Sequence, residues 1–199
     1  QSYNTTYPLR IYFYCVRPAR FGGATPMADT RRILARLPEV LVQRFVRKGY
    51  LYVRNFGAGF GVPWQKAFGT EDPREVDRYC RDHEIEAIWK ADGRLHTRQR
   101  RDVVSVHPRN GEHAWFNHIL FFHVTSLASE VSDVLRAEFA DNDLPNQTFY
   151  GDGKPIEDDV IATIRAAYEA ERVAVPWQRG DLLMLDNVFT AHGREPFSG

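Results

Sequence analysis

Residues 177–192 read WQRGDLLMLDNVFTAH. The Arg-Gly pair in this stretch predicts a turn, because glycine adopts backbone angles that other residues avoid. The apolar residues 182–185 have the composition of a buried strand, and we expect residues 181–185 to form a hairpin with residues 173–177. Asp186 and Asn187 end that strand. His192 therefore follows a strand and a polar turn.

Working outward, short strands and helices alternate along the chain without a repeat. Residues 9–16 are rich in aromatic and β-branched side chains on both faces, which predicts a buried strand, central in its sheet. An Asn-Gly pair at 110–111 predicts a hairpin. Helices are expected at 129–139 and at 155–170, the second with proline in its first turn. This mixture favours a mainly β fold, a jelly roll decorated by helices, over a doubly wound fold.

The glycine-rich stretch 57–61 does not alter that interpretation. It reads GAGFG, which lacks the Gly-x-Gly-x-x-Gly spacing of a dinucleotide-binding loop. The residues after it do not resemble the first turn of a phosphate-binding helix. We expect a plain turn at this position.

Length and composition narrow the function classes. The chain has 199 residues, which is enough for one domain with a sizeable core. Basic and acidic residues both number 26, so no positive excess indicates a nucleic acid or an anionic membrane surface as partner. No apolar run approaches the ~20 residues of a membrane helix. Cys15 and Cys80 are predicted to be buried thiols in a reducing cytoplasm. The oligomeric state is not indicated.

The other histidines are less informative than His192. Four of them lie in charged or polar sequence and are expected to be solvated: His83, His96, His107 and His113. His118 and His123 flank an apolar segment and are an alternative pair of metal ligands, although no carboxylate lies near them in the sequence.

Two parts of the chain resemble one known family. The order of Trp177, the glycine turn, the apolar strand, Asp186-Asn187 and His192 is similar to the C-terminal half of iron(II)- and 2-oxoglutarate-dependent oxygenases of the taurine dioxygenase and clavaminate synthase type. The N-terminal third resembles the same family through Tyr7-Pro8, residues 11–15, Pro18-Ala19 and above all Gly22-Gly23-Ala24-Thr25-Pro26. The resemblance is closest to the branch that acts on amino acids or amino-acyl groups in peptide natural-product pathways.

Members of this family hold Fe(II) with two histidines and one carboxylate. The first histidine and the carboxylate form a His-x-Asp or His-x-Glu pair, yet no histidine of this chain has an acidic residue two positions later. The resemblance places that pair just before Gln1, and the arginine that binds 2-oxoglutarate beyond Gly199. We therefore expect one oxygenase domain that is incomplete at both ends. Residues 1–199 alone are expected to bind iron weakly and to be inactive.

The resemblance also assigns roles to single residues. His192 corresponds to the distal iron ligand, and Thr25 to a residue that hydrogen-bonds the carboxylate of 2-oxoglutarate. Asp186 and Asn187 are expected to shape the turn that orients His192.

Two further residues are candidates for substrate contact. Asn117 lies in an aromatic-Phe-Asn run that relatives share, and we expect it to face the substrate. Arg194 follows the distal histidine in a His-Gly-Arg pattern and could pair with a substrate carboxylate. The implied reaction uses Fe(II), 2-oxoglutarate and dioxygen to hydroxylate an unactivated carbon of an amino acid or a carrier-bound amino-acyl group.

Three alternatives stay open at this point. A halogenase keeps the fold but replaces the ligand carboxylate with a small residue. An inactive relative would serve as a binding module, because a fold alone does not guarantee chemistry. A cupin-like metal site that uses His118 and His123 is the third alternative.

Overall fold

A computed structural model describes residues 6–57 and 61–199 of the chain. Two compact units make up the chain. Unit 1 combines the residues up to Gln43 with Val103–Asn117 and Asp159–Gly199, and unit 2 combines Arg44–Asp102 with His118–Asp158. Residues 58–60 of the turn expected at 57–61 lie outside the described residues.

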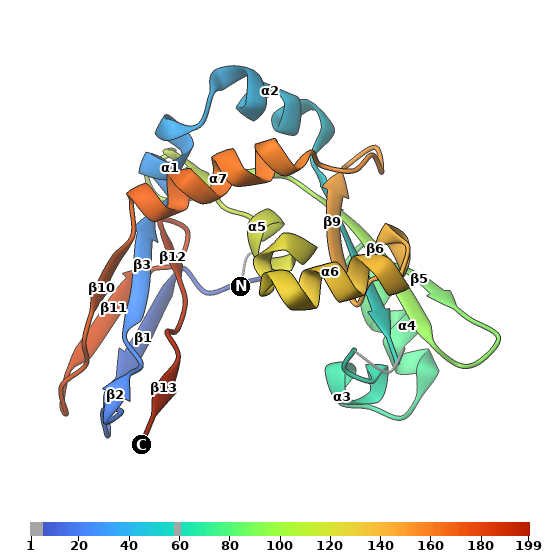
Figure 1. Cartoon of the computed structure of the whole chain (residues 1–199), viewed down its shortest axis with the longest axis horizontal. Coiled ribbons are helices and arrows are strands. Elements are labelled where there is room, and N and C mark those ends of the chain that lie inside the picture. The colour runs from blue at the N-terminus through green and yellow to red at the C-terminus, as the bar shows by residue number, and fades with distance from the viewer. Residues whose placement is uncertain (1–5, 58–60) are drawn as a thin grey trace. The chain divides into compact units, whose positions relative to one another are not determined.

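Unit 1 contains short antiparallel strands. Their bounds are β1 Arg10–Tyr14, β2 Phe21–Gly22, β3 Thr25–Asp29, β7 Val104–Val106, β8 His113–Trp115, β10 Val173–Val175, β11 Leu182–Asp186, β12 Thr190–His192 and β13 Phe197–Ser198. Strand β1 pairs with β11, while β3 lies between β10 and β12 (Figure 1). Strand β2 pairs with β13, and β7 with β8. Small antiparallel sheets with helices beside them agree with the predicted jelly-roll class.

The sheet of β1 and β11 has one inner and one outer face. Phe13 lies opposite Leu183 in the register of the two strands. The Phe13 ring contacts the imidazole of His192 in the other sheet, with ring centroids 5.5 Å apart. Side chains alternate along a strand, so Tyr12 and Tyr14 point the other way, and they are 57% and 64% exposed. The two sheets therefore face each other across Phe13 and His192.

Two helices of unit 1 begin where their sequences favour it. Helix α1 (Thr30–Arg36) begins after Asp29, whose carboxylate accepts the backbone N–H of Arg31. Helix α7 (Asp158–Ala170) ends just before Glu171, which is largely buried and pairs with Arg32 and Arg36. These ion pairs connect the ends of the two helices.

Unit 2 is built on a four-stranded antiparallel sheet. Its strands are β4 Tyr50–Phe56, β5 Glu86–Trp89, β6 Leu95–Arg101 and β9 Asn146–Tyr150. They follow the order β5-β6-β4-β9. The helices of this part of the chain are α2 Glu39–Lys48, at the boundary with unit 1, α3 Trp64–Phe68, α4 Pro73–Asp82, α5 Ile119–Phe122 and α6 Ser129–Glu138. Buried Leu95, Val76 and Cys80 belong to one apolar cluster under this sheet.

The structure corrects three sequence predictions. Residues 173–177 and 181–185 do not form a hairpin, because β10 pairs with β3 whereas β11 pairs with β1. The turn at Gly180 instead connects two sheets. Helix α7 begins at Asp158 and not at Pro155, which forms a β-bridge with Phe149. Strand β1 is not central, since β11 is its only partner among the described strands.

Other predictions are confirmed. Cys15 and Cys80 are free and buried. The Asn-Gly hairpin joins β7 to β8, and α6 spans the predicted residues almost fully. Among the described residues, no helix has the length and apolar character needed to cross a membrane.

Candidate active site

The pairing of β3 with β12 places Thr25 and His192 on the same face of one sheet. His192 lies directly opposite Met27 in the antiparallel register. Thr25 precedes Met27 by two positions, and side chains two positions apart on a strand point to the same face. Two residues predicted from motifs far apart in the sequence are therefore neighbours on one surface, the face that contacts Phe13.

His192 has the hydrogen-bond pattern of a metal-binding histidine. The side chain is half-buried, and its Nδ1 lies 3.3 Å from the backbone oxygen of Thr190. A carbonyl oxygen can only accept, so Nδ1 carries the proton in this contact and Nε2 keeps a free lone pair. Metal-binding histidines commonly donate their second ring N–H to a backbone carbonyl in this way.

The Thr25 hydroxyl accepts a hydrogen bond from the Trp177 indole, and its O–H proton stays available for a second bond. Its side chain is buried, and Oγ1 accepts the Nε1–H of Trp177 at 3.0 Å. Because an indole can only donate, the Thr25 hydroxyl still has its O–H to donate. No acceptor for that proton is found within 6–57 and 61–199. A carboxylate oxygen of a ligand would satisfy it.

The Gly-Gly pair before Thr25 allows two chain segments to approach closely. Gly22 and Gly23 have φ angles of 68° and 74°, a conformation that favours glycine. A Cβ on Gly22 would lie 2.2 Å from the backbone oxygen of Pro196. The segment after His192 runs beside the motif, with Gly193 N–H donating to the carbonyl of Pro26. The motif thus fixes the course of the chain on both sides of β3.

The turn between β11 and β12 is held by hydrogen bonds. Asp186 Oδ1 accepts the backbone N–H groups of Val188 and Phe189 at 3.1 and 3.2 Å. Asn187 is buried, and its side-chain amide donates to the carbonyl oxygen of Pro8 at 2.8 Å. These bonds give the turn a defined shape, while the expected effect on His192 stays a prediction.

Asn117 and Arg194 lie in different surroundings. The buried Asn117 amide donates to the backbone oxygen of Val103 at 2.9 Å, which ties it to the chain before β7. Arg194 is exposed, and its guanidinium lies 3.7 Å from the centroid of the Phe197 ring. Their roles toward a substrate remain predictions.

Two histidines that we predicted to be solvated are buried, which corrects the sequence analysis. His96 is 8% exposed, and its Nδ1 lies 2.8 Å from the Asn55 Oδ1 atom. Burial is the main cause that lowers the pKa of His96, with nearby Lys90 and Arg98 adding to it. His107 is 4% exposed, and its Nε2 lies 3.1 Å from Asp186 Oδ2. Both sit in polar sequence, which gave no sign of the distant partners that bury them.

A comparison with known protein families decides the assignment. The sequence profile described as taurine catabolism dioxygenase TauD, TfdA family matches residues 1–199. The chain belongs to this family. The motifs around Thr25 and His192 thus identified the family correctly.

Two relatives match nearly the whole chain. The dapdiamide synthesis protein DdaC of Enterobacter agglomerans is 41% identical over 198 residues, which cover 100% of this chain and 60% of that protein. A clavaminate synthase-like protein of Arabidopsis thaliana is 31% identical over 202 residues, covering 96% of this chain and 58% of that protein. The chain therefore spans about three fifths of the length of these relatives.

A solved structure supports the fold. A crystal structure of asparagine oxygenase in complex with Fe(II), 2S,3S-3-hydroxyasparagine and succinate has a TM-score of 0.53 to this chain. The match covers 100% of this chain and 43% of that chain at 14% sequence identity. This likeness places the chain in the jelly-roll fold of the TauD/TfdA oxygenases, as predicted.

The described residues fit one part of the iron site of this family. The contact between His192 Nδ1 and the Thr190 carbonyl leaves Nε2 as the nitrogen that would bind a metal, and its role as a ligand stays a prediction. Within 6–57 and 61–199, however, no group of three or more His, Cys, Asp or Glu side chains could hold a metal ion. His123 Nδ1 lies 2.8 Å from Thr125 Oγ1, and within residues 6–57 and 61–199 the alternative pair with His118 gains no third ligand.

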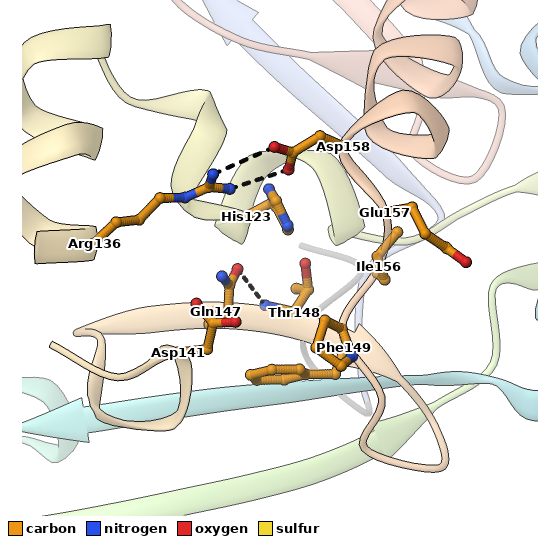
Figure 2. Close-up of a pocket in the computed structure, with 10 residues that line it drawn as sticks. His123, Arg136, Asp141, Gln147, Thr148, Phe149, Ile156, Glu157 and Asp158 are labelled. Atoms are coloured by element: carbon orange, nitrogen blue, oxygen red, sulfur yellow. Dashed lines mark hydrogen bonds and ion pairs between the residues drawn. The ribbon is translucent and has the colours of Figure 1, made fainter.

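Unit 2 contains a separate cavity of about 350 Å³ (Figure 2). Arg136 donates two hydrogen bonds to Asp158 at its rim, and these bonds lower the pKa of Asp158. Gln147 Oε1 accepts the backbone N–H groups of Val124 and Thr148. Arg136 and Asp158 pair with each other and Glu157 pairs with Arg44, so the cavity indicates no particular class of ligand. The residues around it are His123, Arg136, Asp141, Gln147, Thr148, Phe149, Pro155, Ile156, Glu157 and Asp158.

Proposed function

We propose that the protein containing this chain is an Fe(II)- and 2-oxoglutarate-dependent oxygenase in which both units belong to one catalytic domain. The observation that carries the proposal is the shared face of β3 and β12. That face presents His192 with an unprotonated Nε2 and Thr25 with a hydroxyl proton to donate. These are the two groups through which the family pattern assigns iron and 2-oxoglutarate to this part of the chain.

His192 supplies one iron ligand in this proposal, and a His-x-Glu pair outside residues 1–199 supplies the others. The relatives support this division, because the chain spans only 60% and 58% of their lengths. When bound, Fe(II) and 2-oxoglutarate together activate dioxygen for the oxidation of an unactivated carbon. The protein orients these groups and keeps water away from them.

Thr25 binds the carboxylate of 2-oxoglutarate in this scheme. Its position is fixed by β3 and by the hydrogen bond from Trp177, so its O–H needs little reorganisation to meet the ligand. An arginine outside residues 1–199 would pair with the same carboxylate. Asp186 and Asn187 would hold the turn that orients His192.

The proposed substrate is an amino acid or an amino-acyl group carried on a partner protein. Support comes from the similarity to a protein of dapdiamide synthesis, whose name places it in a biosynthetic pathway. Arg194 is exposed and pairs with no carboxylate in the described part of the chain. Its planar guanidinium could therefore bind a substrate carboxylate through two hydrogen bonds. Asn117 is a second proposed substrate contact.

The test is a turnover screen with the full-length protein, Fe(II), 2-oxoglutarate and dioxygen. Succinate and oxidised product are measured with free amino acids, carrier-bound amino acids and small sulfonates. We expect product only from the amino-acid classes, and none from the His192→Ala variant. The exposed His113→Ala variant is the matched control and should retain activity.

Three results would change the assignment. Turnover of sulfonates alone would contradict the substrate class but keep the iron and 2-oxoglutarate chemistry. A chlorinated product in the presence of chloride would identify a halogenase. Absence of both succinate and metal binding would indicate an inactive binding relative.

A further inference from the structure

We propose that His107 is a positioning residue that fixes the turn between β11 and β12 and thereby the orientation of His192. His107 follows β7 and is 4% exposed. Its Nε2 lies 3.1 Å from Asp186 Oδ2, a residue distant in sequence on the turn. The role presupposes that His192 binds iron, as proposed above.

The tautomer of His107 follows from its two contacts. The backbone N–H of Arg109 donates to Nδ1 at 3.3 Å, so Nδ1 acts as the acceptor. The proton must then reside on Nε2, which donates it to the carboxylate of Asp186. His107 therefore accepts a hydrogen bond from its own hairpin through Nδ1 and donates one to the turn through Nε2.

The Asp186 carboxylate bonds both to His107 and to the backbone of the turn. Its Oδ1 accepts the N–H groups of Val188 and Phe189, while Oδ2 accepts the proton of His107. One carboxylate therefore stabilises the turn with one oxygen and is itself held by the other. Loss of the His107 donor would free the carboxylate to rotate and weaken both backbone bonds.

The His107 ring also packs on the turn. It stacks on the Phe189 ring with centroids 4.4 Å apart and planes 23° apart. The Arg31 guanidinium lies 4.3 Å from the centroid of the Phe189 ring. Arg31 is held by Asp29 at 2.8 Å and by Glu112 at 3.3 Å, so it offers a fixed surface. Phe189 is therefore restrained by two planar groups.

The turn leads directly into the strand that carries His192. Phe189 precedes Thr190, the first residue of β12 and the residue whose carbonyl contacts His192 Nδ1. The backbone N–H and the Oγ1 of Thr30 hold the carbonyls of Phe189 and Val188 at 3.0 and 2.7 Å. A shift of the turn would move the Thr190 carbonyl and change the angle of the His192 ring.

Three variants of the full-length protein separate this role from simple packing. His107→Phe keeps a ring that can stack on Phe189 but removes the donor to Asp186. His107→Gln keeps a donor but removes the ring. His113→Phe alters an exposed histidine of the same hairpin and is the matched control.

Two readouts are needed. The first is the ¹⁵N chemical shifts of the His192 ring in metal-free protein, which report its tautomer and environment. The second is the Fe(II) dissociation constant under anaerobic conditions. We expect His107→Phe to change the His192 shifts and to weaken Fe(II) binding by about 10- to 100-fold, the usual effect of losing a group that orients a ligand. His107→Gln should recover most of the affinity, and His113→Phe should match the unmodified protein.

Unchanged His192 shifts and Fe(II) affinity in a folded His107→Phe variant would overturn the proposal. If that variant does not fold, Asp186→Asn decides, because it keeps one oxygen for the turn but presents an N–H to His107. Unchanged readouts there would have the same meaning. Fe(II) binding that persists in His192→Ala would instead refute the iron-ligand assignment, while the metal-free shifts would still test His107.

Discussion

The four-stranded sheet of unit 2 and the strands around His192 in unit 1 are stabilised by different interactions. In unit 2, Val53 and Leu95 are 0% and 1% exposed. In the sheet of β1 and β11, Tyr14 and Leu182 are 64% and 67% exposed. The first region buries its apolar side chains, whereas the second leaves one face of its sheet open to solvent.

The region that carries the candidate site has buried apolar residues such as Leu185 and Val188, but specific polar contacts fix its turn and side chains. The turn at Asp186 and the hydroxyl of Thr25 are each held by hydrogen bonds to side chains distant in sequence. Such bonds are directional and therefore fix side-chain geometry, but each contributes only about 1 kcal/mol. Substitutions should then reduce stability most in unit 2 and affect ligand binding most in unit 1.

The largest expected change in the free energy of unfolding comes from a leucine-to-alanine substitution in unit 2, compared with the same substitution in unit 1. Leu95→Ala leaves a cavity in the apolar cluster with Val76 and Cys80 and should lower the free energy of unfolding by about 2–5 kcal/mol. Leu182→Ala removes an exposed side chain and should change it by less than about 0.5 kcal/mol. Chemical denaturation of both variants measures the difference. Equal losses would show that the outer face of β1 and β11 is covered in solution.

Asp186→Ala should have an intermediate effect. It removes the acceptor for two backbone N–H groups and leaves the buried His107 without its partner. We expect the free energy of unfolding to fall by about 1–3 kcal/mol. Denaturation monitored together with amide hydrogen exchange of the turn provides the measurement. Unaltered exchange at Val188 and Phe189 would contradict the role given to Asp186.

Trp177→Phe should have a smaller effect on stability and a specific effect on binding. It removes the indole donor to Thr25 and should cost about 1 kcal/mol. It should also weaken 2-oxoglutarate binding by the full-length protein. Trp89→Phe is the matched control, because Trp89 donates a similar bond to Asp77 in unit 2 at 2.8 Å. Calorimetric titration of both variants distinguishes them, and equal 2-oxoglutarate affinities would count against Thr25 as a ligand contact.

The last expected effect is absent at neutral pH and develops only in alkaline solution. Burial raises the pKa of the Cys80 thiol to about 11, with the nearby Asp77 charge adding to it. From the ordinary value of 9.0 upward, the unfolded chain loses this proton while the folded chain keeps it. The free energy of unfolding should therefore fall between pH 9 and 11, and less so in Cys80→Ala. If the free energy of unfolding changes equally with pH in the unmodified protein and in Cys80→Ala, the Cys80 thiol does not contribute.

Much of the fold could be predicted from periodicity and turn chemistry. Helix α6 spans nearly all of its predicted residues, and β7 and β8 form the expected Asn-Gly hairpin. Strand β6 could not be found, because its sequence LHTRQRR lacks apolar alternation and relies on the neighbouring strands for its place. Pairing partners were also hidden: adjacent segments β10 and β11 joined different sheets.

The candidate site shows the same limit. The motifs located Thr25 and His192, and the sheet register placed them on one face. The contact of His107 with Asp186 was missed because the two residues lie far apart along the chain. Sequence patterns report local structure well, whereas a buried polar pair between distant residues becomes visible only when the chain is folded.

Fe(II) binding to the full-length protein under anaerobic conditions tests the central assignment most directly. His192→Ala is compared with His113→Ala, which changes an exposed histidine and not the site. We predict one Fe(II) per chain for the unmodified protein and for His113→Ala, and loss of stoichiometric binding for His192→Ala. Equal Fe(II) binding by all three proteins would contradict the assignment of His192 as an iron ligand.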